Sequence, residues 1–317
     1  MSRSVSFPTS LRLTLLAVML AACGGSGEQT APAVPATEGA AVTIFQFSRD
    51  YIFLSTGKDS PIVAPLTISA MDDGENLQRH WIGWVARGAQ WDRFLDTSRR
   101  TSRAGGVWGV LPANELQVIA GGPSEVESFL YEQAGRRLRM VIGTPRSDWN
   151  QGGNNRFRIL DGSLLIGAEN ASGLIFEVLR VERSEADGWP VSQDHDVVFL
   201  TSGADLQLLM STETGSGNAA FTWIHSAEED LVPPDGVVSW LEVQPLEEAR
   251  RDIPIAWTLT NQTAGLSGEV RAIGRDVVLG PERGGRRAVE IRYSVEGSIT
   301  INGTSRPVAG TIRHAQQ

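Results

Sequence analysis

The sequence predicts an all-β protein of antiparallel sheets, with one or two short helices. The first observation is a period of two in residues 255–260 and 289–296, where apolar and polar side chains alternate as in strands with one buried face. The second is a pair of turn dipeptides, Asp161-Gly162 and Asn302-Gly303, each placed between strand-like segments as in a hairpin. The third is a content of 34 glycines among many short strand candidates, which favours barrels or sandwiches.

Residues 1–22 have the composition of a secretory signal peptide. Arg3 and Arg12 precede or begin an apolar segment, and Ala21 and Ala22 supply the small residues that cleavage requires. The apolar segment has about half of the roughly 20 residues needed to span a bilayer. It therefore indicates a leader and not a membrane-spanning helix.

Cys23, the single cysteine of the chain, follows this leader directly. The sequence Leu20-Ala21-Ala22-Cys23 resembles the bacterial lipobox, which implies lipid attachment to Cys23 and cleavage just before it. Two or three acyl chains bind a bilayer far more firmly than one. We expect a lipid-anchored protein of the bacterial cell envelope, and Gly24 favours the outer membrane, facing the periplasm.

Residues 23–41 are rich in glycine, alanine and proline and have almost no bulky apolar side chain. Such a segment is expected to be a flexible tether, with a reach on the order of 25 Å.

Strand-like segments follow one another along the rest of the chain. Besides those around the two turn dipeptides and residues 255–260 and 289–301, they are residues 43–54, 62–71, 79–86, 107–110, 115–119, 138–142, 174–181, 196–201, 205–211, 219–225 and 237–243. The two helix candidates are residues 123–135, which begin with a Ser-x-x-Glu capping box and end at Gly135, and residues 90–96.

An internal repeat predicts two related β domains. Residues 50–57 match residues 196–203, and a Trp-Ile pair follows each copy, as Trp81-Ile82 and Trp223-Ile224. A single core stops growing at about 250 to 300 residues, so two domains fit the length better than one. The expected domains are residues 42–187 and 188–317.

The second half of the chain resembles the lipocalin-like family of carotenoid hydratases (hydroxyneurosporene-synthase type) and AttH-type proteins. The residues that support the resemblance are 196–203 followed by 206–210, the Pro254-x-x-Trp257 strand, and the closing hairpin with Glu296, Gly297, Gly303 and Gly310. The resemblance implies two tandem lipocalin-like barrels or sandwiches.

Two departures set the chain apart from that family. The family's aspartate-histidine-x-tryptophan stretch has Val197 where tryptophan would stand, and residues 311–313 replace its final tyrosine and glutamate. The resemblance therefore implies the fold more strongly than the reaction.

The leading functional hypothesis is a membrane-anchored protein that binds an apolar or amphipathic small molecule in a barrel cavity. Trp223, Trp257 and Tyr293 are the candidate lining residues, because small barrels hold such ligands among aromatic side chains. The same tryptophans could instead fill packed cores.

Two alternatives remain open. One is a hydratase or isomerase acting on an isoprenoid or lipid, in which His195, Asp196 and Glu296 would supply proton transfer from a carboxylate with a raised pKa. The other is a structural or partner-binding envelope protein without a ligand. A net charge of −9 disfavours nucleic acid as a partner.

No cofactor and no metal site is expected. The four histidines, His80, His195, His225 and His314, lack the spacing of metal ligands. Residues 148–155 alternate oxygen ligands as a calcium loop does, but Ile159 stands where the closing glutamate belongs, so a hairpin loop is the better interpretation.

Overall fold

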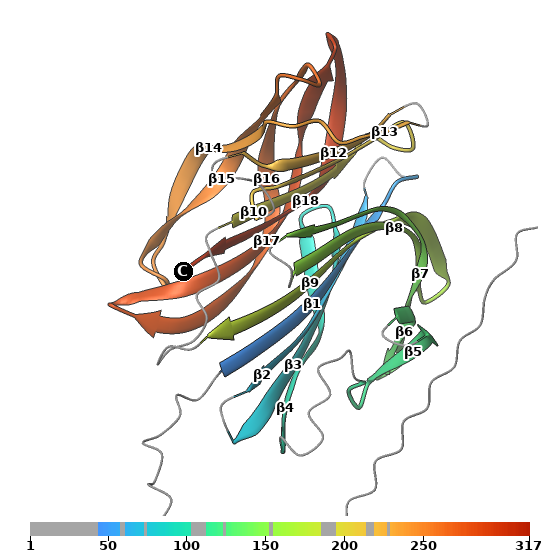
Figure 1. Ribbon diagram of the computed structural model, residues 1–317, viewed down its shortest axis with the longest axis vertical. Helices are drawn as coiled ribbons and strands as arrows, with labels where there is room; N and C mark the ends of the chain where they lie inside the picture. The colour runs from blue at the N-terminus through green and yellow to red at the C-terminus, as the bar shows by residue number, and fades with distance from the viewer. Residues whose placement is uncertain are drawn as a thin grey trace, which may run out of the picture. The chain divides into compact units, whose positions relative to one another are not determined.

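The computed structural model describes residues 44–57, 61–72, 75–102, 112–122, 125–151, 155–184, 195–213, 219–226 and 229–317 (Figure 1). The expected leader, Cys23, the tether, the expected strand at 107–110 and the expected domain boundary at 187 and 188 lie outside these residues. Every regular element in the described residues is a β-strand, which confirms the all-β class. These residues include no helix that could cross a membrane.

Nine antiparallel strands form the first sheet, which curls on itself (Figure 1). They are β1 (Ile44–Ser55), β2 (Ile62–Asp72), β3 (Asn76–Arg87), β4 (Gln90–Ser102), β5 (Leu116–Gly122), β6 (Glu125–Gln133), β7 (Arg136–Gln151), β8 (Asn155–Ile166) and β9 (Glu169–Ser184). Their order in space is β4-β3-β2-β1-β9-β8-β7-β6-β5. Consecutive strands pair except β4 and β5, and β1 closes the middle of the sheet on β9.

The second sheet repeats this topology with nine further strands. They are β10 (His195–Thr201), β11 (Leu206–Ser211), β12 (Phe221–Ser226), β13 (Glu229–Leu231), β14 (Gly236–Leu246), β15 (Arg251–Asn261), β16 (Leu266–Arg283), β17 (Arg286–Ile301) and β18 (Thr304–Gln316). Their order is β13-β12-β11-β10-β18-β17-β16-β15-β14, so each strand corresponds to the one nine places earlier. The two curled sheets form two tandem lipocalin-like domains.

Buried apolar side chains form one core inside each sheet and a third core between them. The first inner core includes Tyr51, Trp81 and Phe129, and the second includes Trp257 and Tyr293. The intersheet core joins outer-face side chains of both sheets: Ile52, Leu54, Val63, Ala86, Phe157, Ile159, Leu174, Phe176, Val178, Val197, Phe199, Leu209 and Trp223. The sheets thus share a continuous apolar contact.

The two copies of the internal repeat begin in corresponding strands, β1 and β10, but their side chains face opposite ways. Phe53 packs in the first inner core, whereas Phe199 packs in the intersheet core. Trp81 and Trp223, both on the third strand of their sheets, differ in the same manner. A change of phase by one residue moves every side chain of a strand to the other face. Matching residues of the two repeat copies therefore have different surroundings.

Both helix predictions are wrong. Residues 125–133 form β6, which pairs with β5 and β7, and residues 90–96 belong to β4. In β6 the burial of Phe129 and Tyr131 between neighbouring strands outweighs the local capping signal, since tertiary packing overrides propensity. Ala134 and Gly135 both have positive φ and make a two-residue hairpin turn instead of a helix stop.

The three predicted hairpins had different outcomes. Asn302-Gly303 joins β17 to β18, as predicted. The hairpin at Asp161-Gly162 is wrong, because β8 runs straight through it and pairs on both sides. A Cβ on Gly162 would lie 2.6 Å from the Ile175 side chain, so this glycine permits close packing. The pairing of β7 with β8 shows a hairpin at residues 148–155, but residues 148–151 and 155 belong to the paired strands and not to the loop.

Candidate functional site

A cleft of about 280 Å³ lies between the two sheets. One wall comes from β1, β2, β3 and β9, and the other from β16, β17 and β18. Part of the lining is apolar, with Ile82, Trp84, Val278, Pro281 and Val289, and part is polar or ionisable, with Ser48, Asp50, Thr67, Ser69, His80, Arg180, Glu290 and Arg313. The cleft therefore offers both kinds of surface to one small molecule.

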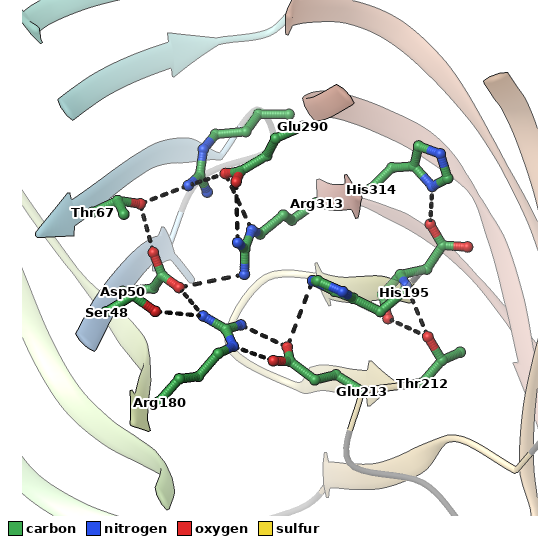
Figure 2. Close-up of polar contacts among 12 residues, drawn as sticks. Ser48, Asp50, Thr67, Arg180, His195, Thr212, Glu213, Glu290, Arg313 and His314 are labelled. Atoms are coloured by element: carbon green, nitrogen blue, oxygen red, sulfur yellow. Dashed lines mark hydrogen bonds and ion pairs between the residues drawn. The ribbon is translucent and has the colours of Figure 1, made fainter. Parts of the chain in front are cut away.

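A network of six buried or half-buried charges lies at this cleft (Figure 2). It contains three carboxylates and three guanidiniums, from Asp50, Glu213, Glu290, Arg180, Arg292 and Arg313. Asp50 and Arg180 lie on β1 and β9 of the first sheet. In the second sheet, Glu290 and Arg292 lie on β17, Arg313 lies on β18, and Glu213 follows β11. The network is thus built only when both sheets are in place.

The Asp50 carboxylate of the first sheet forms an ion pair with an arginine of the second sheet. The Asp50 side chain is only 1% exposed. It accepts hydrogen bonds from Thr67 Oγ1 at 2.5 Å, from Arg313 Nη1 at 3.3 Å and from Arg180 Nη1. Asp50 and Arg313 are 263 residues apart in sequence, so this contact fixes one sheet against the other.

The second sheet adds a forked ion pair. Arg313 donates to Glu290 through Nε at 3.2 Å and through Nη2 at 3.1 Å. Arg292 donates from Nη2 to the same carboxylate at 2.8 Å and to Thr67 Oγ1 of the first sheet at 2.8 Å. Bidentate arginine pairs of this kind hold a fixed geometry as well as supplying energy.

Arg180 extends the network toward the other side. It donates from Nη2 to Glu213 Oε2 at 2.6 Å, and His195 Nε2 lies 3.6 Å from the same carboxylate oxygen. His195, one of the sequence candidates, therefore belongs to the interface and faces Glu213.

The arginines determine the charge state of the carboxylates. Burial alone would raise the pKa of Asp50, but the charges of Arg313, Arg180 and Arg292 outweigh it and hold that pKa well below its usual range. For the same reasons Glu213, beside Arg180 and His195, has its pKa lowered to about 2. These carboxylates are ionised near neutral pH and cannot donate protons.

Trp84 on β3 connects the first sheet to the second. Its indole Nε1 donates to Asp276 Oδ2 at 2.6 Å, and Arg292 Cζ lies 4.4 Å from its ring centroid. A guanidinium over an indole face is attracted by the ring quadrupole. Trp84 is thus held in a fixed position on the cleft wall.

His80 also lines the cleft and is held by a carboxylate. Its Nε2 lies 2.8 Å from Asp96 Oδ1 across β3 and β4. Histidine is the side chain that exchanges protons near neutral pH, and a neighbouring carboxylate orients its ring. This pair was not among the site residues expected from sequence.

The structure does not bring the three catalytic candidates from the sequence together. His195 faces the intersheet network, while Asp196 points to the other face of β10 and contacts His314. Glu296 is exposed on β17, so it is not held in an apolar pocket.

The three expected lining residues also separate. Trp257 and Tyr293 pack against each other in the second inner core, with ring centroids 5.0 Å apart. Trp223 packs in the intersheet core instead. The face reversal of the repeat accounts for this separation.

Sequence reasoning missed the ionic network because its members look like ordinary solvated charges along the chain. One signal was present: Arg292 and Arg313 occupy alternating positions of strands whose other side chains are largely buried. A charge at such a position needs a partner from elsewhere. Among the described residues, no group of acidic, histidine or cysteine side chains could hold a metal ion.

Fold and site together define a two-domain, lipocalin-like protein with a partly apolar, partly polar cleft between its sheets. The chain shares this fold with kievitone hydratase from Nectria haematococca, at a TM-score of 0.52 and 11% identity over 87% of this chain and 90% of that one. The resemblance inferred from sequence is thereby confirmed at the level of the fold.

Two other solved structures were found with lower scores. An AttH-type protein from Nitrosomonas europaea has a TM-score of 0.46 and 11% identity, over 86% of this chain and 92% of that one. CghA with Sch210972 has a TM-score of 0.37 and 9% identity, over 87% and 89%. No family model and no curated protein matches the chain.

Proposed function

We propose that this protein binds an amphipathic small molecule with a neutral polar end in the cleft between its sheets. The observation that supports this is the mixed lining, with an apolar wall around Trp84 and Ile82 beside the polar groups of Thr67 and Ser69. Small-molecule sites are typically apolar pockets of roughly 300 Å³ or more with a few fixed polar groups. The cleft, at about 280 Å³, suits a compact ligand.

The balance of charges argues for a neutral ligand. Asp50 and Glu290 line the cleft together with Arg180 and Arg313, and each is already paired within the network. A charged ligand would have to break one of these pairs and leave a buried charge without its partner, which is costly. A ligand hydroxyl can instead donate to the remaining lone pair of Thr67 Oγ1, and a ligand hydroxyl or carbonyl can bond to the Ser69 hydroxyl.

This proposal moves the ligand from a barrel interior to the cleft. Trp257 and Tyr293 are fully buried and in contact, so a ligand there would have to displace packed side chains. A ligand in the cleft meets Trp84 without such a change.

Attachment of the chain to the envelope through Cys23 is part of the same proposal. A tethered cleft would exchange amphipathic molecules with the bilayer surface. A Cys23→Ala variant should lack the mass of the acyl chains on its N-terminal peptide. Retention of that mass would contradict the lipid anchor.

The binding proposal is tested by native mass spectrometry of the full-length protein, followed by organic extraction of any bound molecule. Ser69→Phe fills the cleft, and Ser298→Phe makes the same change at an exposed site on β17. We expect one stoichiometric adduct in the wild type and in Ser298→Phe, and none in Ser69→Phe. An adduct unaffected by Ser69→Phe refutes the cleft; no adduct after incubation with membrane extract favours a structural or partner-binding role.

A hydratase or isomerase is the second candidate, and the His80–Asp96 pair is the observation that favours it. With Asp50 and Glu290 held ionised, His80 is the cleft-lining group suited to moving a proton onto a double bond. Kievitone hydratase, which has the same fold, is named for a hydration. The isolated ligand should then gain one water, or isomerise, with wild-type protein but not with His80→Gln. Equal conversion by both proteins removes this candidate.

A further inference from the structure

A second polar cluster lies inside the second sheet, on the face of β10 and β18 away from the cleft. His314 Nδ1 is 2.7 Å from Asp196 Oδ1, and the two residues are register partners on β18 and β10. The His314 side chain is 0% exposed. In Figure 2 its ring lies to one side of the ionic network and points away from Arg313.

One polar atom of this cluster, Nε2 of His314, is buried without a hydrogen-bond partner in the part of the chain that the structure describes. A buried polar atom left unsatisfied costs about 1 to 3 kcal/mol, so such atoms in a native protein call for an explanation. A ligand that bonds to them is one such explanation.

Trp240 stands between this cluster and the outside. Its Nε1 donates to Asp196 Oδ2 at 2.7 Å, and its ring meets the His314 ring edge-on at a centroid distance of 5.3 Å. Yet 44% of Trp240 is exposed. It lies on edge strand β14, next to a register shift between Trp240 and Glu242. An edge strand with a bulge can move more easily than a strand paired on both sides.

Trp240 also lines an arginine-rich hollow of about 320 Å³. Arg250, Arg251 and Arg286 line it with two carboxylates, those of Glu247 and Asp252. Within the described residues these arginines make no ion pair; Arg250 and Arg251 donate to backbone carbonyls instead. The hollow thus favours an anionic group.

We propose that the second domain contains a separate binding site for an aromatic carboxylate with a hydroxyl group, and that Trp240 is its gate. The ligand's ring takes the place of the Trp240 indole, its hydroxyl donates to His314 Nε2, and its carboxylate meets the arginines of the hollow. Asp196 holds the His314 ring with Nε2 facing the ligand. The site is independent of the cleft.

The test uses the indole N–H signals of ¹⁵N-labelled full-length protein with Cys23→Ser, titrated with 4-hydroxybenzoate. Trp240→Phe and Trp84→Phe assign the two reporter signals, one for the hollow and one for the cleft. We expect a saturable shift of the Trp240 signal, because it loses its bond to Asp196, and a stationary Trp84 signal. A Trp240 signal that does not move at millimolar ligand overturns the proposal.

Benzoate is the matched control ligand, because it lacks only the hydroxyl. It should bind about tenfold more weakly than 4-hydroxybenzoate to the wild type, which corresponds to one hydrogen bond of about 1.4 kcal/mol. In His314→Gln, whose amide can still bond to Asp196, the two ligands should bind alike. If benzoate and 4-hydroxybenzoate bind the wild type with equal affinity, the role of His314 is overturned, whether or not His314→Gln folds. A shift of the Trp84 signal alone would assign the ligand to the cleft.

Discussion

Replacing Asp50 with asparagine should destabilise the protein strongly. The change keeps the shape of the side chain but removes one of three negative charges from a network with three positive ones. Arg180 and Arg313 then share a buried charge without its partner. Breaking a buried pair in this way costs about 3 to 5 kcal/mol, out of a typical total stability of about 5 to 15 kcal/mol.

Urea unfolding measures this effect. With a slope of about 3 kcal/mol per molar urea, the midpoint of Asp50→Asn should fall by about 1 M or more. The matched control is Asp205→Asn, because Asp205 is 83% exposed and lies 3.8 Å from Arg306. That change should stay within about 0.5 kcal/mol of the wild type.

A charge-balancing variant separates lost charge from lost packing. Adding Arg313→Met to Asp50→Asn leaves Glu213 and Glu290 against Arg180 and Arg292, so the remaining charges balance. The double variant should be more stable than Asp50→Asn alone, because buried ion pairs can be replaced by apolar groups at little cost. A loss below about 1 kcal/mol for Asp50→Asn, or no recovery in the double variant, would refute the reasoning.

Two further predictions concern the Glu213 carboxylate and the close approach of strands at Gly310. The pKa of Glu213 is lowered to about 2 from an ordinary value of about 4.5, so ionised Glu213 stabilises the fold above pH 4.5 and this stabilisation is lost as pH falls from 4.5 to 2. Over that pH range the wild type should therefore lose up to about 3 kcal/mol more stability than Glu213→Gln does. Gly310→Ala should destabilise by several kcal/mol in thermal unfolding, because its Cβ would lie 2.2 Å from Phe199 O, whereas Gly57→Ala, with nothing within 4 Å, should be nearly neutral. Equal melting temperatures for the two glycine variants would contradict the close approach of β18 to β10.

The fold was predictable because its signals are local. Alternation in residues 289–301 reflects one buried face of β17, and Asn302-Gly303 fixes the hairpin to β18. Strand β16 was missed because glycine, arginine and valine alternate weakly there and much of it is half-buried. The capping box near residue 125 led to a wrong helix prediction, because the same short sequence can stand at the start of a helix or of a strand.

The candidate site was not predictable from sequence, since it depends on contacts between the two sheets. Nothing near Asp50 in sequence indicates Arg313 or Glu290 as its neighbours. Asp50 and Asp196 occupy matching positions of the repeat, yet they lie on opposite faces of their sheets. Only the relative phase of β1 and β10 decides which aspartate meets the arginines.

The central claim is that a small molecule binds in the cleft, and the indole signal of Trp84 tests it most directly. A membrane lipid extract would be added to ¹⁵N-labelled full-length protein with Cys23→Ser, with Trp84→Phe assigning the signal. We predict a saturable shift of Trp84 that Ser69→Phe abolishes and Ser298→Phe preserves, while the buried Trp257 signal stays in place. A shift of Trp257 with Trp84 unchanged would place the ligand in the barrel interior and contradict the account.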